Sequence, residues 1–168
     1  MVRGQDQPPA PLADATGFRF AVVVSRFNEA VTDSLRDAAT AALKEAGASS
    51  VQVLAVPGAF EIPQAARAAA ESGRFDAIVC LGCVIRGETP HFDYLASAVA
   101  HGITAAAGDT GLPMAFGVLT TDTVEQATAR SGPGPDNKGR EAAAAAIEMA
   151  VLCRTISGTP NRSSGFRV

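Results

Sequence analysis

Cysteine, positive charge and long apolar runs are all in short supply in this sequence of 168 residues, and each shortage excludes a class of protein. The three cysteines are too few for a disulfide scaffold and indicate a reducing compartment. Lys and Arg number 14 against 17 Asp and Glu, a balance that argues against nucleic-acid binding. No apolar run approaches the ~20 residues that cross a bilayer, and residues 1–11 contain no apolar signal core, so we expect a cytoplasmic protein.

Two of the cysteines, Cys80 and Cys83, form a C-x-x-C within the apolar run AIVCLGCVI. The alternation of a strand would turn these two side chains to opposite faces, and no second Cys or His pair completes a zinc site. Redox-active pairs normally lie at the amino terminus of a helix, where the thiol pKa is lowered. We therefore interpret both as buried structural thiols.

The length fits one compact domain, which we place at residues 18–156. Residues 1–17 contain the PPAP segment and no apolar periodicity, and residues 157–168 read SGTPNRSSGFRV. We expect these segments to be a flexible amino-terminal arm and a flexible carboxy-terminal tail.

Apolar strand-like runs alternate with helical segments along the domain. The runs lack the polar alternation of half-exposed strands, which suits strands buried on both faces. Strands are predicted at 18–24, 51–56, 75–85 and 113–120, and helices at 31–46, 64–72, 92–107, 123–130 and 137–156. Gly47, Gly73 and Gly108 would end the first three helices, and Thr123 and Gln126 have the spacing of a capping box. This order predicts an α/β fold, a four-stranded parallel sheet with helices on both faces.

The final helix is apolar around more of its circumference than one sheet can cover. Ala142–Ala146 is followed by Ile147, Met149, Val151 and Leu152. A stripe of about 100° suffices to pack against a sheet, so the excess indicates a second buried face and hence an oligomer. The alternative is that the alanines reflect only their high helix propensity.

Ligands of open parallel sheets bind beyond the carboxyl ends of the strands, where two predicted loops carry a phenylalanine. Phe27 follows the first strand and Phe60 follows the second. Because turns favour small and polar residues, a flat aromatic ligand stacked on these rings would explain both positions. The alternative for each ring is that it folds back onto the core.

The loop after the third strand, Gly87–His91, reads GETPH and opens a predicted helix. Backbone donors and the helix dipole favour an anion such as phosphate there, although an ordinary helix cap would read the same. No Walker loop and no G-x-G-x-x-G follows any strand. Since histidine titrates near neutrality, His91 is a candidate for proton transfer, whereas His101 lies inside a predicted helix and is interpreted as structural.

Two cations flank the glycine- and proline-rich segment Ser131–Asp136. Arg130 could bind a phosphate through two parallel hydrogen bonds, and Lys138 could act as a point charge. Surface cations usually bind nothing, so the spacing alone leaves both readings open. Glu141, three residues after Lys138, would share its helix face and could orient either cation.

Five segments in this order resemble the 6,7-dimethyl-8-ribityllumazine synthase family of riboflavin biosynthesis. They are SRFN at 25–28, PGAFEIP at 57–63, GCVIRGETPHFDY at 82–94, FGVLT at 116–120 and NKG at 137–139. The resemblance spans about residues 18–156. It implies a flavodoxin-like three-layer fold and a condensation of 5-amino-6-ribitylaminouracil with 3,4-dihydroxy-2-butanone 4-phosphate, without a metal or redox cofactor.

The resemblance also implies roles for individual residues. Phe27 would stack on the pyrimidine, Asn28 would border it, and His91 would move protons. The backbone at Val84 and Ile85 would bond the ring edge, and the ribityl chain would be lined by Ala59, Phe60 and Glu61. The anion segment would comprise Gly87, Glu88 and Thr89, with Arg130 completing the phosphate site as a catalytic group.

Assembly is part of what the resemblance implies. Family members form pentamers, some of which build icosahedral shells, and Phe116, Arg130 and Lys138 would come from a neighbouring subunit. The segment Ser131–Asp136 has two prolines where the family has a basic turn, so pentamer and shell both stay open. A binding module without turnover and a shell whose main role is assembly are the competing readings.

Overall fold

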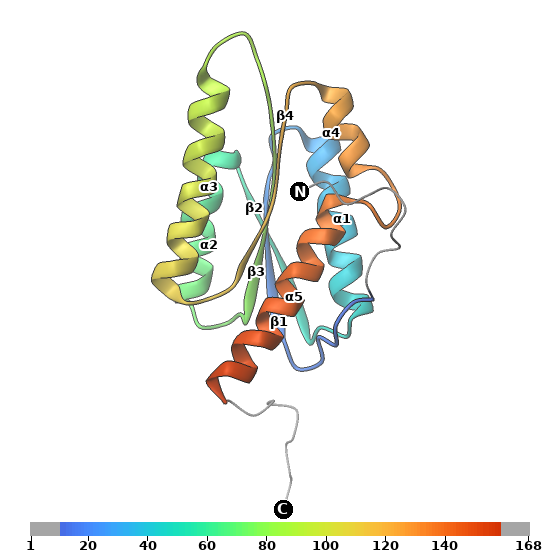
Figure 1. Cartoon of the computed structure of the whole chain (residues 1–168), viewed down its shortest axis with the longest axis vertical. Helices are drawn as coiled ribbons and strands as arrows, with labels where there is room; N and C mark the ends of the chain where they lie inside the picture. Colours follow the sequence, from blue (N-terminus) through green and yellow to red (C-terminus); the bar gives the residue numbers. More distant parts are fainter. Residues whose placement is uncertain (1–10, 159–168) are drawn as a thin grey trace, which may run out of the picture.

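Four parallel strands form the middle layer of the molecule (Figure 1). The structure is a computed structural model and describes residues 11–158. The strands lie in the order β2-β1-β3-β4, which confirms the expected four-stranded parallel sheet. Their bounds are β1 Arg19–Ser25, β2 Ser50–Val56, β3 Ala77–Ile85 and β4 Met114–Thr121. The apolar runs of the sequence therefore mark all four strands of the described chain to within two residues.

Helices cover both faces of the sheet, which confirms the flavodoxin-like three-layer α/β/α fold (Figure 1). One layer consists of α1 (Glu29–Glu45), α4 (Val124–Ser131) and α5 (Lys138–Ser157). The other consists of α2 (Ile62–Glu71), the short 3-10 turn η1 (Ala59–Glu61) and α3 (His91–Thr110). Each layer packs its own apolar cluster against the sheet.

Strand β3 lies at the centre of both clusters, and every residue from Ala77 to Val84 is buried. Cys80 packs with the α2 and α3 layer, whereas Cys83 packs with the α1 and α5 layer, as the strand alternation predicts. Burial raises the pKa of Cys80 to about 12 and that of Cys83 to about 11. Both thiols therefore stay protonated near neutral pH, which agrees with a structural role.

Two helix boundaries that differ from those predicted from the sequence lie at a glycine and at a proline. Gly108 does not end α3, which runs on to Thr110 and ends at Gly111 with φ of 67°. Gly108 is exposed, and a helix tolerates glycine in such a place; it is the left-handed backbone at Gly111 that stops the helix. α2 starts at Ile62, earlier than predicted, because Pro63 fits the first turn of a helix.

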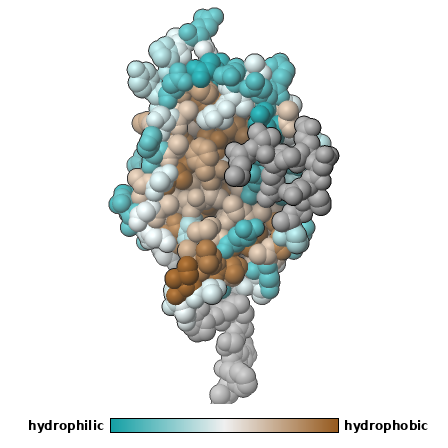
Figure 2. Space-filling model, in the orientation of Figure 1, coloured by the Kyte–Doolittle hydropathy of each residue, from teal (hydrophilic) through white to brown (hydrophobic). Residues whose placement is uncertain are grey.

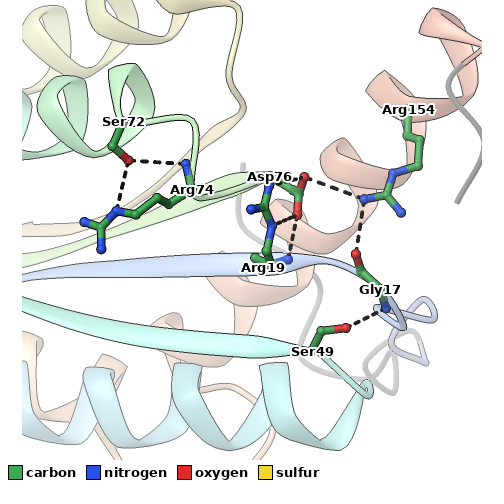
Figure 3. Close-up of polar contacts among 7 residues, drawn as sticks. All are labelled: Gly17, Arg19, Ser49, Ser72, Arg74, Asp76 and Arg154. Carbon is green, nitrogen blue, oxygen red and sulfur yellow. Dashed lines mark hydrogen bonds and ion pairs between the residues drawn. The ribbon is translucent and has the colours of Figure 1, made fainter. Parts of the chain in front are cut away.

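The amino-terminal end of the sheet is closed by polar contacts around Asp76 (Figure 3). Its Oδ2 atom accepts hydrogen bonds from the backbone N–H of Arg19 at 2.8 Å and from Arg19 Nε at 3.1 Å. Arg154 of α5 reaches Asp76 Oδ1 at 3.6 Å and lies 3.4 Å above the ring of Phe18. These contacts join β1, the start of β3 and the last helix.

Part of the predicted arm packs against this same end. The Ala15 side chain is fully buried, its N–H donates to Ala46 O at 2.8 Å, and Thr16 bridges to Ala48. Residues 1–10 of the arm and 159–168 of the tail lie outside the described residues. Between residues 11 and 158, none of the helices combines the length and apolar character of a membrane span.

Candidate active site

The loops after β2, β1 and β3 lie side by side at the carboxyl end of the sheet, because these strands are neighbours in that order. Phe27 after β1 is 70% exposed, and Phe60 after β2 is 64% exposed. Neither ring folds back onto the core of this chain. Exposure of two large aromatic rings at the end where α/β sheets bind ligands favours the stacking reading over the packing one.

Asn28 ties the loop after β1 to β3. It adopts φ of 60° and ψ of 49°, and it is the only non-glycine residue with positive φ between residues 11 and 158. This left-handed conformation costs an ordinary residue about 1–2 kcal/mol, and asparagine tolerates it best. Its Nδ2 atom donates to Cys83 O at 2.8 Å, which offsets that cost and fixes Phe27 beside the end of β3.

Strand β3 continues beyond β1 and leaves part of its backbone edge open. The last β1–β3 pair is Val24 with Leu81, whereas β3 pairs with β4 as far as Ile85. The N–H groups of Ile78 and Arg86 donate toward β4, so alternation turns the backbone of Cys83 and Ile85 toward the side of β1. The carbonyl of Cys83 accepts the hydrogen bond from Asn28 Nδ2. The N–H and C=O of Ile85 then face the space beside Phe27, where a ring edge could bind.

The segment after β2 forms a rigid turn that directs Phe60 outward. Ala59 and Ile62 are buried, whereas Phe60 between them is exposed. The N–H of Gly58 donates to Glu61 Oε2 at 2.9 Å, which closes the 3-10 turn. A carboxylate has two oxygens, so Oε1 of Glu61 can still accept a hydrogen bond from a hydroxyl group.

The turn Gly87–His91 is exposed along its whole length and leads into α3. His91 is the first residue of α3, and Pro90 caps that helix, with its carbonyl accepting from the N–H of Asp93 at 3.1 Å. The first-turn N–H groups and the positive end of the helix dipole favour an anion here. Gly87, Glu88, Thr89 and His91 are therefore placed together at the same end of the sheet as the two phenylalanines.

Phe116, Arg130 and Lys138 are not brought to these loops. Phe116 on β4 pairs with Cys80, five residues before Ile85 and therefore roughly 16 Å from the end of β3. Arg130 donates from Nη1 to Gln126 O within α4, and Lys138 forms an ion pair with Glu141 within α5. In the described part of the chain, the hydrogen bonds and ion pairs of these two cations do not reach the loops after β1, β2 or β3.

Asn137 and Gly139 hold the two cations in place, a role that the sequence reasoning did not assign. The buried Asn137 donates from Nδ2 to Ser131 O at 2.8 Å and to Gly132 O at 3.0 Å, and it accepts from Gly139 N at 2.8 Å. A Cβ on Gly139 would lie 2.0 Å from Leu35 O of α1. The NKG motif thus anchors the start of α5 and turns only Lys138 outward. The burial of Asn137 and the close approach of Gly139 to Leu35 cannot be recognised in a single sequence, which shows only the NKG motif.

An apolar surface runs over β4 and continues to the lower end of α5 (Figure 2). Its groove is lined by residues of α3, β4 and α5, among them Ile103, Ala107, Phe116 and Met149. Leu152 and Ile156 of α5 are 49% and 75% exposed. The second apolar face that the sequence predicts for the last helix is therefore present and exposed on this chain.

Across residues 11–158, no group of three or more His, Cys, Asp or Glu side chains is arranged to hold a metal ion. The candidate site consists instead of aromatic rings, an open backbone edge, a carboxylate and a helix amino terminus.

Comparisons with known proteins identify the family of this chain. The family model described as 6,7-dimethyl-8-ribityllumazine synthase matches residues 17–154. A protein of that name from Syntrophus aciditrophicus (strain SB) is 53% identical over 144 residues, which are 84% of this chain and 94% of the relative. One from Salinibacter ruber (strain DSM 13855 / M31) is 54% identical over 144 residues, 84% of this chain and 92% of the relative. The chain belongs to the 6,7-dimethyl-8-ribityllumazine synthase family.

Proposed function

We propose that this protein condenses 5-amino-6-ribitylaminouracil with 3,4-dihydroxy-2-butanone 4-phosphate to give 6,7-dimethyl-8-ribityllumazine, phosphate and water. Family membership supports the reaction. The structural observation that carries the proposal is the exposed Phe27, held by Asn28 beside the open backbone of Ile85. A planar heterocycle with polar edges satisfies both features at once.

The pyrimidine substrate occupies the half of the site formed by the loops after β1 and β2. Phe27 stacks on the ring, Asn28 borders it, and the open backbone of Ile85 bonds its edge, with Val84 next to it on β3 but with its own backbone turned toward β4. The ribityl chain extends along η1, where its hydroxyl groups meet Ala59, Phe60 and Glu61. The carboxylate of Glu61 accepts from these hydroxyls, because one of its oxygens is not needed to close the turn.

The phosphate-bearing substrate occupies the half formed by the turn before α3. Gly87 and Thr89 hold the phosphate, with Glu88 on the same exposed segment. Arg130 and Lys138 supply the positive charge, and Phe116 covers the second face of the bound ring. Because Phe116 lies roughly 16 Å from the end of β3 in its own chain, these three residues act on the site of a neighbouring subunit.

A homo-oligomer, a pentamer or a shell built from pentamers, brings the two halves together. The exposed apolar face over β4 and α5 supports such an assembly, since a monomer rarely exposes so much contiguous apolar surface. Free thiols at Cys80, Cys83 and Cys153 support a location in the reducing cytoplasm.

The chemistry requires proton transfers and the release of phosphate. The amine attacks the ketone, water leaves to form an imine, phosphate is eliminated, and ring closure releases a second water. His91 at the start of α3 moves protons in these steps, a contribution of about 10²- to 10⁴-fold. Arg130 stabilises the charge that builds on the departing phosphate. Holding both substrates in one slot lowers the entropic barrier of the bimolecular step.

The deciding experiment mixes the purified protein with both substrates and follows the coloured, fluorescent lumazine. Formation above the spontaneous rate supports the enzyme. Binding of the ribityl-pyrimidine without turnover would instead support a binding module. His91→Ala should lower kcat and leave binding of the pyrimidine intact, and an unchanged kcat would remove His91 from the mechanism.

Co-expression tests whether the site is shared between subunits. Phe27→Ala and Arg130→Ala chains each lack one half of the site, so mixed oligomers contain some sites with both halves intact. We expect the mixture to recover part of the activity that each variant lacks alone. Recovery no greater than the sum of the two separate variants would show that Phe27 and Arg130 serve the same chain's site. Light scattering distinguishes pentamers from shells in the same samples.

A further inference from the structure

One exposed arginine joins three elements next to the anion half of the site. Arg86 follows β3, and its N–H donates to Thr121 O at the end of β4 at 2.9 Å. Its side chain donates from Nε to Asp122 Oδ1 at 2.8 Å and from Nη1 to Asp93 Oδ2 at 3.0 Å. The guanidinium also lies 4.2 Å from the ring centroid of Phe92. The ends of β3 and β4 and the first turn of α3 thus meet at this one side chain.

The turn between Arg86 and α3 has little packing of its own to define it. Gly87, Glu88, Thr89, Pro90 and His91 are all exposed, and a Cβ on Gly87 would meet no atom within 4 Å. The Arg86–Asp93 ion pair spans seven residues and bridges both ends of this turn. Since Asp93 lies one position beyond the stacked Phe92 and two beyond His91, the bridge restrains the backbone that carries His91.

The expected sizes of its effects on stability and on the reaction rate indicate what this network does. Asp93 and Asp122 are 60% and 65% exposed, and exposed ion pairs contribute only about 0–1 kcal/mol to stability. A displacement of about 1 Å in a catalytic group, in contrast, can lower a rate about a hundredfold. The two carboxylates would also repel a bound phosphate, and the single positive charge of Arg86 offsets half of their charge. Their hydrogen bonds raise the pKa of Arg86 further above its usual range, so its positive charge is permanent.

We infer that Arg86 is a positioning residue, which holds the turn Gly87–His91 so that Thr89 and His91 face the phosphate-bearing substrate. The inference rests on the proposed function. Arg86 acts through the turn and does not itself touch the reacting atoms. Asp93 transmits the constraint to α3, and Asp122 anchors the guanidinium to β4.

The chain offers a matched control for a substitution at Arg86. Arg67 also binds two exposed carboxylates, Glu71 at 2.8 Å and Asp109 at 3.0 Å, and it joins α2 to α3 away from the turn. Replacing either arginine by glutamine removes one cation and two ion pairs. The two variants therefore lose the same charge and the same number of ion pairs, and Arg86→Gln also loses the contact with the ring of Phe92.

For Arg86→Gln we expect kcat to fall by about tenfold to a hundredfold and KM for the butanone phosphate to rise. Affinity for the ribityl-pyrimidine should stay within about twofold, because Phe27 and Glu61 lie on other loops. Arg67→Gln should keep wild-type kinetics, and both variants should unfold at nearly the same temperature. Arg86→Lys should recover part of the loss, since lysine keeps the charge without the two-pronged geometry.

The two carboxylates sharpen the test. Asp93→Asn should lower kcat more than Asp122→Asn, because Asp93 belongs to the helix turn that carries His91. Combining Asp93→Asn with Arg86→Gln should add little to the single change, as expected for partners in one interaction. Equal kinetics for Arg86→Gln and Arg67→Gln would overturn the inference. An equal loss of affinity for both substrates would also overturn it, since it would mark a general structural role.

Hydrogen exchange separates this inference from the proposed function. Amides of residues 87–95 should exchange faster in Arg86→Gln than in wild type, and binding of inorganic phosphate should weaken, whether or not lumazine is formed. If wild type makes no lumazine while Arg86→Gln shows both faster exchange and weaker phosphate binding, the proposed function is wrong, and the inference that Arg86 positions the turn is supported. If wild type is active and neither change occurs, the function stands and the inference about Arg86 is wrong.

Discussion

The two ends of the same four-stranded sheet are built in opposite ways. At the amino-terminal end, Asp76 is bound by Arg19 and Arg154, and residues that are far apart in the chain satisfy one another. At the carboxyl end, Phe27 and Phe60 point into solvent, and the turn before α3 is exposed. The amino-terminal end is closed by contacts within the chain, whereas the carboxyl end leaves two aromatic rings and a turn exposed to a ligand.

The difference shows how a small domain separates stability from binding. Contacts at the carboxyl end fix the backbone at single points, such as Asn28 on Cys83 O, and leave the neighbouring side chains available. At the amino-terminal end, Asp76 accepts from both the backbone and the side chain of Arg19 and pairs with Arg154, so the polar side chains there are used within the chain. We therefore expect substitutions at the amino-terminal end to change the free energy of unfolding, and substitutions at the carboxyl end to change affinity and rate.

The largest effect should come from Gly139→Ala, which tests whether the segment behind the cations is rigid. The added Cβ would lie 2.0 Å from Leu35 O, and backbone atoms cannot move away as a side chain can. We expect a loss of about 3 kcal/mol in urea unfolding, or no folded protein. Gly108→Ala is the matched control, because its Cβ meets nothing within 4 Å, and it should stabilise α3 by up to about 1 kcal/mol. Similar values for the two variants would contradict the close approach of α5 to α1.

Asp76→Ala should lower the free energy of unfolding by about 2 kcal/mol, because it removes the acceptor of the Arg19 backbone N–H and of Arg19 Nε, and one partner of Arg154. Affinity for the ribityl-pyrimidine should not change. Asp109→Ala breaks only an exposed ion pair with Arg67, so its cost in the same urea titration should stay below about 1 kcal/mol. A weaker substrate complex in Asp76→Ala would show that the two ends of the sheet are coupled.

Phe27→Ala should have the opposite effect to Asp76→Ala, a change in substrate affinity and not in stability. Because the ring is 70% exposed, its loss should leave unfolding nearly unchanged, whereas affinity for the ribityl-pyrimidine should fall about tenfold. Fluorescence or calorimetric titration measures the affinity. Phe27→Leu keeps an apolar side chain without a flat ring and should recover little of it. A large loss of stability in Phe27→Ala would mean that the ring packs inward in solution.

The smallest effect should be a pH dependence at the amino-terminal end. A hydrogen bond from Arg140 lowers the pKa of Glu45, where α1 ends. A carboxyl group with a lowered pKa in the folded chain stabilises the fold above its unfolded pKa, and this is lost as the pH falls through the lowered value. Glu45→Gln should therefore unfold slightly below wild type at pH 7 and together with it in strong acid. A constant difference across that range would exclude the ion pair as its cause.

The residue pattern was enough to predict the architecture and which loops lie at the carboxyl end of the sheet. Apolar runs marked β1 to β4, and the order of strands and helices implied the parallel sheet. The expected burial on both faces holds for β1 and β3 but is wrong for β2, because β2 lies at the edge of the sheet and only its Val56 is buried. The carboxyl-end rule also predicted that Phe27, Phe60 and His91 would share one end of the sheet. Burial and chain order are local or periodic properties, so a single sequence carries them.

The remaining features depend on atoms that meet only after folding. Whether Phe27 faces solvent, which backbone group Asn28 binds, and how closely Gly139 approaches Leu35 are set by distances between elements remote in sequence. The same holds for Arg86, which has the composition of any surface arginine until the fold places Asp93 and Asp122 beside it. Packing in three dimensions decides which side chains become partners. No periodic pattern along the sequence reveals that packing.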